Sequence, residues 1–132
     1  MADDDDLPEL GISLDTVCWL ISRARAFDAK EAGDGDTDAD EDDVEAHLLD
    51  EEADTIEEEM REAIAELNED EQAALIALAW VGRGEFDLSE WNEALRLAKE
   101  RNLRNADDYL LGMPLLADYL EEGLAAFGLT CE

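Results

Sequence analysis

The sequence predicts an all-α protein, a single compact domain of five to six helices, bundle-like or orthogonal, with an acidic disordered loop. Three observations predict this class. Apolar residues recur at intervals of three and four, helix start and stop residues punctuate those segments, and no stretch alternates apolar and polar residues as a strand would. The chain has 132 residues, 46% of them hydrophobic, which is enough for one core without disulfides or metals.

The predicted domain spans residues 12–132 and is interrupted by an acidic loop at residues 31–48. Residues 1–11 are acidic and carry a proline and a glycine, so we expect a flexible N-terminus. Residues 31–45 hold nine acids, two glycines and no basic residue. Such a composition buries too little apolar surface to offset the entropy lost on ordering, and we expect disorder there.

The first two helices flank this loop. Ser13 is a suitable N-cap for a helix over about residues 13–30, in which apolar residues follow at helical spacing. From about Asp50 to Leu67 apolar residues again repeat at three and four, while carboxylates cover the other face. This pattern is typical of an amphipathic helix.

A central helix is expected next. Asn68 and Glu71 have the spacing of a capping box, with Asn in the usual place of Ser or Thr. The following segment, ALIALAW, is apolar on more than one side, which indicates burial all round. Gly82 and Gly84 supply the stop.

Three further helices complete the prediction. Asp87 and Glu90 form a start signal for a helix that runs to about residue 101. Asn105 is expected to cap a short turn of helix, ADDYLL, which Gly112 ends. Pro114 suits the first turn of the last helix, PLLADYLEEGLAAF, and Gly128 closes it.

The net charge of the chain limits the classes of partner that we expect it to bind. The chain has 39 Asp plus Glu and 9 Lys plus Arg, a formal net charge of -30. Such a surface repels phosphate backbones and anionic membranes, so we expect no direct nucleic-acid binding and no membrane binding. A basic protein is the complementary partner. Acid-rich surfaces also occur where a protein must stay soluble at high salt, and composition does not separate the two readings.

The two cysteines, Cys18 and Cys131, have no C-x-x-C and no companion histidines. They are too few for a disulfide scaffold, and a zinc site lacks ligands. Cys18 stands among apolar residues, so we expect a buried thiol, whereas Cys131 is expected to be exposed. No secretion signal and no run of about 20 apolar residues is visible, which favours a cytoplasmic protein.

Three segments of the chain resemble a known family. These are ISLDTVCWLISRARAFDAKEA, EQAALIALAWVGRGEFD and YLLGMPLLADYLEEGLAAFGLTCE. They are similar to a family of small bacterial proteins catalogued as a domain of unknown function, number 3775. The resemblance implies a helical domain in a bacterial, cytoplasmic protein, and it supplies no activity and no catalytic residues.

The stretch DGDTDADEDDVE, residues 34–45, looks at first like a calcium loop. Its sixth position is Ala39, where an EF-hand needs glycine for a sharp turn, and its eighth is a glutamate in place of an apolar residue. We therefore expect no specific metal site and no cofactor. The weak metal candidates in the stretch are Asp34, Asp36, Asp38, Asp40 and Glu45.

A second window, AWVGRGEFDLSE, has the glycine and the closing glutamate of an EF-hand but lacks acids at its first, third and fifth places. A plain turn between two helices, capped by Asp87, is the better interpretation. Arg83 within it is expected to pair with the protein's own carboxylates. The single histidine, His47, has neither Ser nor Cys nearby in sequence, so no catalytic constellation is visible.

The leading hypothesis is a non-enzymatic protein–protein interaction or regulatory module, with an apolar groove near Trp91 and Met113 and a field that selects basic partners. The segment LLGMPLL gathers leucines and a methionine around a helix break. The partner-contact candidates are Arg83, Trp91, Leu111, Met113 and Leu115.

The alternative is a small-molecule or divalent-cation-binding module, with an enzyme as one form of it, that uses a pocket between the central and final helices. A closed aliphatic interior would speak against this alternative, and a cavity with buried Asp or Arg would favour it. The oligomeric state stays open.

Overall fold

The computed structural model describes residues 8–33, 43–102 and 105–131, with side chains for 8–27, 54–101 and 105–131. This part of the chain is helical and has no strand, so the predicted all-α class is confirmed. The helices are α1 (Leu14–Gly33), α2 (Asp43–Glu66), α3 (Glu69–Arg83), α4 (Trp91–Asn102), α5 (Ala106–Leu111) and α6 (Leu116–Ala126), and a short 3₁₀ helix, η4 (Leu88–Glu90), precedes α4.

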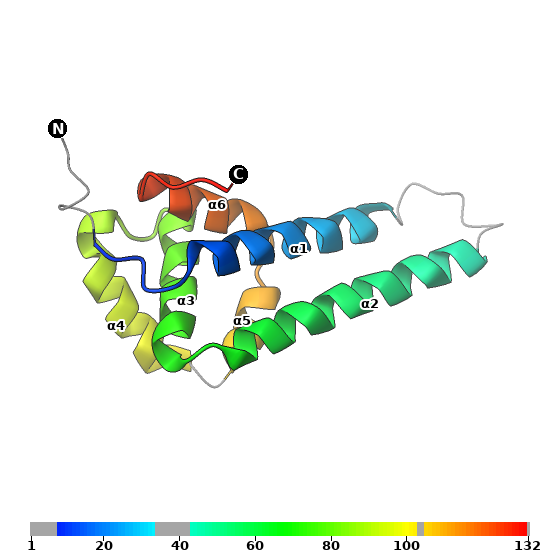
Figure 1. The fold of residues 1–132 in the computed structure, drawn as a ribbon, viewed down its shortest axis with the longest axis horizontal. Helices are drawn as coiled ribbons and strands as arrows, with labels where there is room; N and C mark the ends of the chain where they lie inside the picture. Colours follow the sequence, from blue (N-terminus) through cyan, green and yellow to red (C-terminus); the bar gives the residue numbers. More distant parts are fainter. Residues whose placement is uncertain (1–7, 34–42, 103–104, 132) are drawn as a thin grey trace.

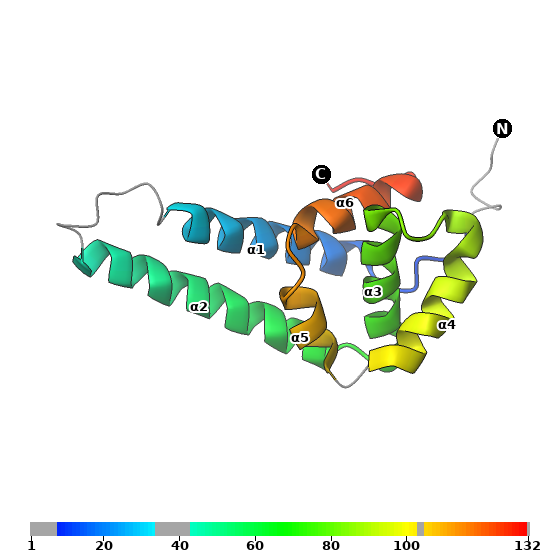
Figure 2. The same cartoon turned by 180° about the vertical axis from the view of Figure 1, so that it is seen from behind.

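The helices form a compact body from which one helical pair projects. α1 and α2 run antiparallel, and their far ends extend beyond the other helices (Figure 1). α3 crosses this pair steeply, with α4 packed on its outer side and α6 packed against both α3 and α1. Seen from behind, α5 lies against α2 and leads up into α6 (Figure 2).

The core is built around α3. Nine consecutive residues of this helix, Ala73 to Val81, are buried, as expected for a helix that is apolar on more than one side. The neighbouring helices each contribute a single buried stripe, for example Ile56, Met60 and Ile64 at intervals of four from α2. α3 is therefore the element on which the others assemble.

Two glycines allow α3 and α6 to approach closely. A Cβ built on Gly82 would lie 1.8 Å from the backbone oxygen of Tyr119, and one on Gly123 would lie 2.5 Å from that of Leu78. Only a hydrogen at these positions leaves room for the backbones to meet. No space for a ligand remains at this contact.

The predicted start and stop signals of α3 are confirmed. The Asn68 side chain accepts a hydrogen bond from the Glu71 backbone N–H at 2.8 Å, and the Asn68 N–H donates to the Glu71 carboxylate at 3.0 Å. Gly84 then ends α3 in the left-handed conformation, at φ 90°. Asp87 and Glu90 begin the next element through an N–H to carboxylate bond of 2.9 Å, so residues 79–90 form the expected turn between helices.

Several predicted boundaries are wrong. α1 continues to Gly33 and α2 begins at Asp43, so the expected disorder of residues 31–45 does not hold at either end. Residues 34–42 lie outside the described residues. The last helix begins at Leu116 rather than Pro114, because Leu115 takes a left-handed conformation that interrupts it. Asn105 precedes α5 without a side-chain cap.

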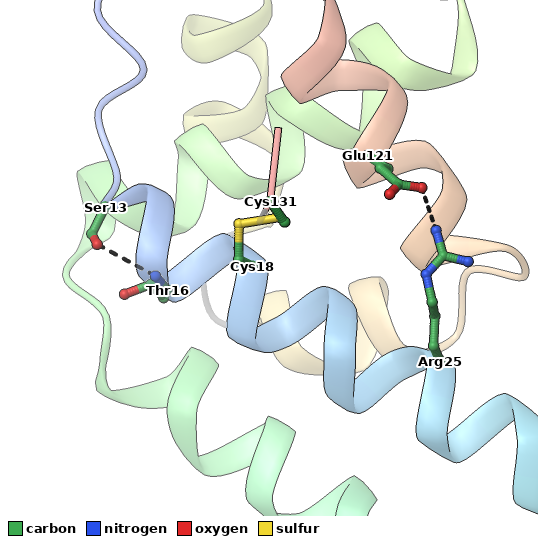
Figure 3. Close-up of a disulfide and its surroundings, with 6 residues drawn as sticks. All are labelled: Ser13, Thr16, Cys18, Arg25, Glu121 and Cys131. Carbon is green, nitrogen blue, oxygen red and sulfur yellow. Dashed lines mark hydrogen bonds and ion pairs between the residues drawn. A yellow bond between two sulfur atoms is a disulfide. The ribbon is translucent and has the colours of Figure 1, made fainter. Parts of the chain in front are cut away.

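The expectations for the two cysteines are corrected by a disulfide that joins Cys18 to Cys131 across 113 residues of sequence. Figure 3 shows the C-terminal segment reaching back to α1, where the bridge forms. Both residues are partly buried. Cys18 is therefore not a buried free thiol, and Cys131 is not a free exposed one.

Trp19 is a large aromatic residue that the fold leaves 40% exposed. It lies beside Cys18 on a turn of α1 whose buried positions are Val17, Leu20 and Ile21. Within the described residues, none of the helices combines the length and the apolar character needed to cross a bilayer.

Candidate interaction groove

Three of the five partner-contact candidates lie together where α5 passes into α6. Leu111 and Met113 line a groove of about 280 Å³ with Gly112, Pro114 and Leu116. The opposite wall comes from α1 and α2. It consists of Ala24, Phe27, Glu57 and Met60. The groove thus joins segments far apart in sequence.

Leu115 stands beside this groove. Its side chain is 56% exposed, the largest exposure among the large apolar side chains of the described residues. Its backbone has φ 63°, and it is the one non-glycine residue with positive φ in this part of the chain. Left-handed geometry costs an L-residue roughly 1–2 kcal/mol. The fold therefore holds a leucine outward at an energetic cost.

Carboxylates from α2 and α5 converge on Arg61, and one of them, Glu57, lines the groove. This guanidinium bonds Glu57 at 2.9 Å, and it also pairs with Asp107 and Asp108. The hydrogen bond to Asp108 is the largest cause that raises the pKa of Arg61 above its usual value, followed by the bond to Glu57. Arg61 therefore stays charged and ties α2 to α5.

Arg25 of α1 pairs with two acids of α6. It contacts Asp118 at 3.2 Å and also Glu121, as Figure 3 shows for the second pair. The two clusters together contain five carboxylates and two arginines, so their formal local charge is -3. We call these two clusters the negative rim, because Glu57 lines the groove and Arg25 directly follows its lining residue Ala24.

Trp91 does not belong to this surface. Only 2% of its side chain is exposed, its ring packs edge-on against Phe127, and its indole N–H donates to the Glu9 backbone oxygen at 3.0 Å. The expected groove near Trp91 is therefore wrong. Trp91 instead anchors the N-terminal segment to α4.

Arg83 lies at the end of α3 and pairs with Glu85, as predicted for a surface arginine. The hydrogen bond to Glu85 is the main cause that raises its pKa. It is not part of the groove. Asp34, Asp36, Asp38 and Asp40 lie outside the described residues, and so does the side chain of Glu45, so the expectation about calcium stays a prediction.

Elsewhere in the described residues no group of three or more His, Cys, Asp or Glu side chains is placed to hold a metal ion. The pocket expected between the central and final helices is also absent from the Gly82–Gly123 contact, where the two backbones touch. A small molecule therefore has no room at this contact of α3 with α6.

The residues of the far wall were missed as site residues. Ala24 and Phe27 continue the apolar stripe of α1, and Met60 belongs to that of α2, so their helical spacing predicted burial only. The sequence feature that could have pointed to this wall is Glu57, because it places a carboxylate next to the apolar stripe of α2. Which stripe faces the α5–α6 junction depends on the tertiary fold.

Comparison with protein families places most of the helical body in one of them. Residues 57–129 match the model of a family described as protein of unknown function, DUF3775. The match covers the end of α2 and all of α3 to α6, and it leaves out both cysteines. No curated protein and no solved structure matches the chain.

Proposed function

The chain belongs to the DUF3775 family of proteins of unknown function, and from this premise we propose that it is a non-enzymatic interaction module. Its groove between α1, α2 and the α5–α6 junction takes an apolar, basic segment of a partner protein. The proposal rests first on Leu115, which is exposed at an energetic cost. Costly local geometry that persists in a fold is a common mark of a functional surface.

The groove fits one or two apolar side chains of a partner. Its walls supply aliphatic and aromatic contacts from Phe27, Met60 and Met113, and a methionine adapts its shape to different partners. Leu115 would be covered when the partner docks. Burial of a leucine is worth about 1.5–3 kcal/mol in full, and roughly half of this side chain remains to be buried.

The negative rim selects the charge of the partner. A local formal charge of -3 within a chain of -30 attracts cations and repels acidic competitors. The occupant we propose is therefore an amphipathic helix with leucine-like anchors on one face and Lys or Arg beside them. Recognition of this kind lays the apolar face of a helix into a groove. We place the protein in the cytoplasm with its partner.

A helical peptide built of Leu and Lys serves as the probe, and a Leu and Glu peptide of the same pattern serves as its control. We expect the Leu–Lys peptide to bind and the control peptide not to bind. Leu115→Asn should weaken binding by about 1 kcal/mol, roughly fivefold in Kd, because an anchor contact is lost. Asparagine tolerates left-handed geometry, so the fold should be kept.

Trp19→Asn is the matched control variant, because Trp19 is the other large exposed apolar residue of the described chain and lies outside the groove. Isothermal titration calorimetry measures the affinities. Equal losses for Leu115→Asn and Trp19→Asn, or none for either, would show that the peptide does not use this groove.

A further inference from the structure

A second cavity lies away from the groove, between α3, α4 and α5. It has a volume of about 230 Å³ and is lined by Ile76, Trp80, Ala98, Arg101 and Tyr109. Ile76, Trp80 and Ala98 form its apolar wall. Arg101 and Tyr109 bring polar groups to it. A mostly apolar cavity with few convergent polar groups is the usual form of a small-molecule site.

Tyr109 brings a hydroxyl hydrogen to this cavity. The Trp80 indole N–H donates to the Tyr109 oxygen at 2.7 Å, and an indole nitrogen cannot accept in return. Arg83, which is also only a donor, lies near the same hydroxyl. Because Trp80 and Arg83 can only donate to the Tyr109 oxygen, the hydroxyl hydrogen of Tyr109 is available for donation to an acceptor.

Arg101 brings a positive charge for which the described part of the chain provides no carboxylate partner. Arg23, Arg25, Arg61, Arg83 and Arg96 each have a carboxylate partner. Arg101 has none among the described residues. In a chain with 39 acids and 9 bases, an arginine without a carboxylate is unexpected on electrostatic grounds, and this one lines a cavity.

We propose that this cavity binds a small organic monocarboxylate. Its carboxylate pairs with Arg101 and accepts the hydroxyl hydrogen of Tyr109, while its apolar part lies against Ile76, Trp80 and Ala98. Arginine and carboxylate match in geometry, and such bonds are stronger than neutral ones. The cavity is smaller than the roughly 300–1,000 Å³ of sites for drug-sized ligands, so the ligand has the size of a single ring or a short chain.

The large negative charge of the protein does not prevent this binding. Residues 1–68 hold 25 acids and 4 bases, whereas residues 69–132, which supply all of the cavity, hold 14 acids and 5 bases. Charges more than about 8 Å away are largely screened at physiological ionic strength. Of the residues that line the cavity, Arg101 is the one that carries a charge, so the wall itself is positive.

Benzoate is the probe for this site, observed by the ¹H–¹⁵N signal of the Trp80 indole, which is assigned by its loss in Trp80→Phe. We expect a saturable shift with a Kd of about 1 mM or below. Neutral benzamide and inorganic phosphate should each bind at least tenfold more weakly, since the first lacks the charge and the second lacks the apolar part.

Arg101→Gln should weaken benzoate binding about tenfold, the effect of losing a hydrogen bond to a charged group. Arg96→Gln is the matched control, because Arg96 lies on the same helix but pairs with Glu93 and Glu100; it should bind benzoate as the unaltered protein does. Both arginines are exposed, so both variants should fold. The proposal is overturned if benzoate does not shift the Trp80 signal, if benzamide or phosphate does so equally well, or if Arg101→Gln binds unchanged.

Discussion

Replacing both cysteines, in the variant Cys18→Ala with Cys131→Ala, is expected to lower the free energy of unfolding by about 2–4 kcal/mol. The bridge spans 113 residues, and the chain-entropy model assigns about 4.7 kcal/mol to a loop of about 100 residues. The effect acts chiefly on the unfolded state. In the folded state α6 stays held by its contact with α3, so only the short segment after Gly128 is released.

Urea unfolding followed by circular dichroism measures this change. The free energy of unfolding falls by about 1–3 kcal/mol per molar urea, so this loss of stability should lower the urea midpoint by roughly 1–2 M. Dithiothreitol should lower the midpoint of the unaltered protein equally and leave that of the double variant unchanged. A midpoint that stays the same after both cysteines are replaced would refute the reasoning.

This bridge bears on the location of the protein. Thiols in the cytoplasm are kept reduced, and disulfides there are rare. A cytoplasmic chain would therefore work mainly in the dithiol form, with the lower stability given above. The interaction groove does not include either cysteine, so reduction should leave its affinity for a basic peptide unchanged.

Two further predictions concern packing and charge. Gly123→Ala should lower the free energy of unfolding by about 1–3 kcal/mol, because the new methyl group would lie 2.5 Å from the Leu78 backbone oxygen. In the same urea assay Gly112→Ala, at an αR position where the nearest backbone oxygen would lie at 3.2 Å, should change it by less than about 1 kcal/mol, and equal effects would contradict the close helix contact. Raising NaCl from about 0.05 to 1 M should raise the thermal midpoint, because the net charge of -30 is screened; a falling midpoint would show that ion pairs outweigh this repulsion.

The parts of the fold that depend on local chemistry were predictable from the sequence. Asn68 with Glu71, and Gly84 after α3, act through hydrogen bonds and backbone angles within a few residues. The burial of α3 followed from apolar residues on all its sides. These signals do not require knowledge of which helices meet.

The parts that depend on distant contacts were not predictable. Spacing along the chain says nothing about whether Cys18 and Cys131 meet, since the disulfide requires the tail after α6 to return to α1. Pro114 is a good first residue for a helix, yet Leu115 takes a left-handed conformation and α6 begins only at Leu116. The groove, likewise, exists only because α5–α6 meets the α1–α2 pair.

NMR mapping of the Leu–Lys peptide on ¹⁵N-labelled protein shows directly whether the apolar groove with its negative rim receives a basic helix. We expect amide shifts to concentrate on residues 111–116 and on Ala24, Phe27 and Met60 of the facing helices. Shifts spread over acidic residues throughout the chain, with Leu115 and Leu116 unmoved, would contradict it and leave only unspecific attraction between opposite charges.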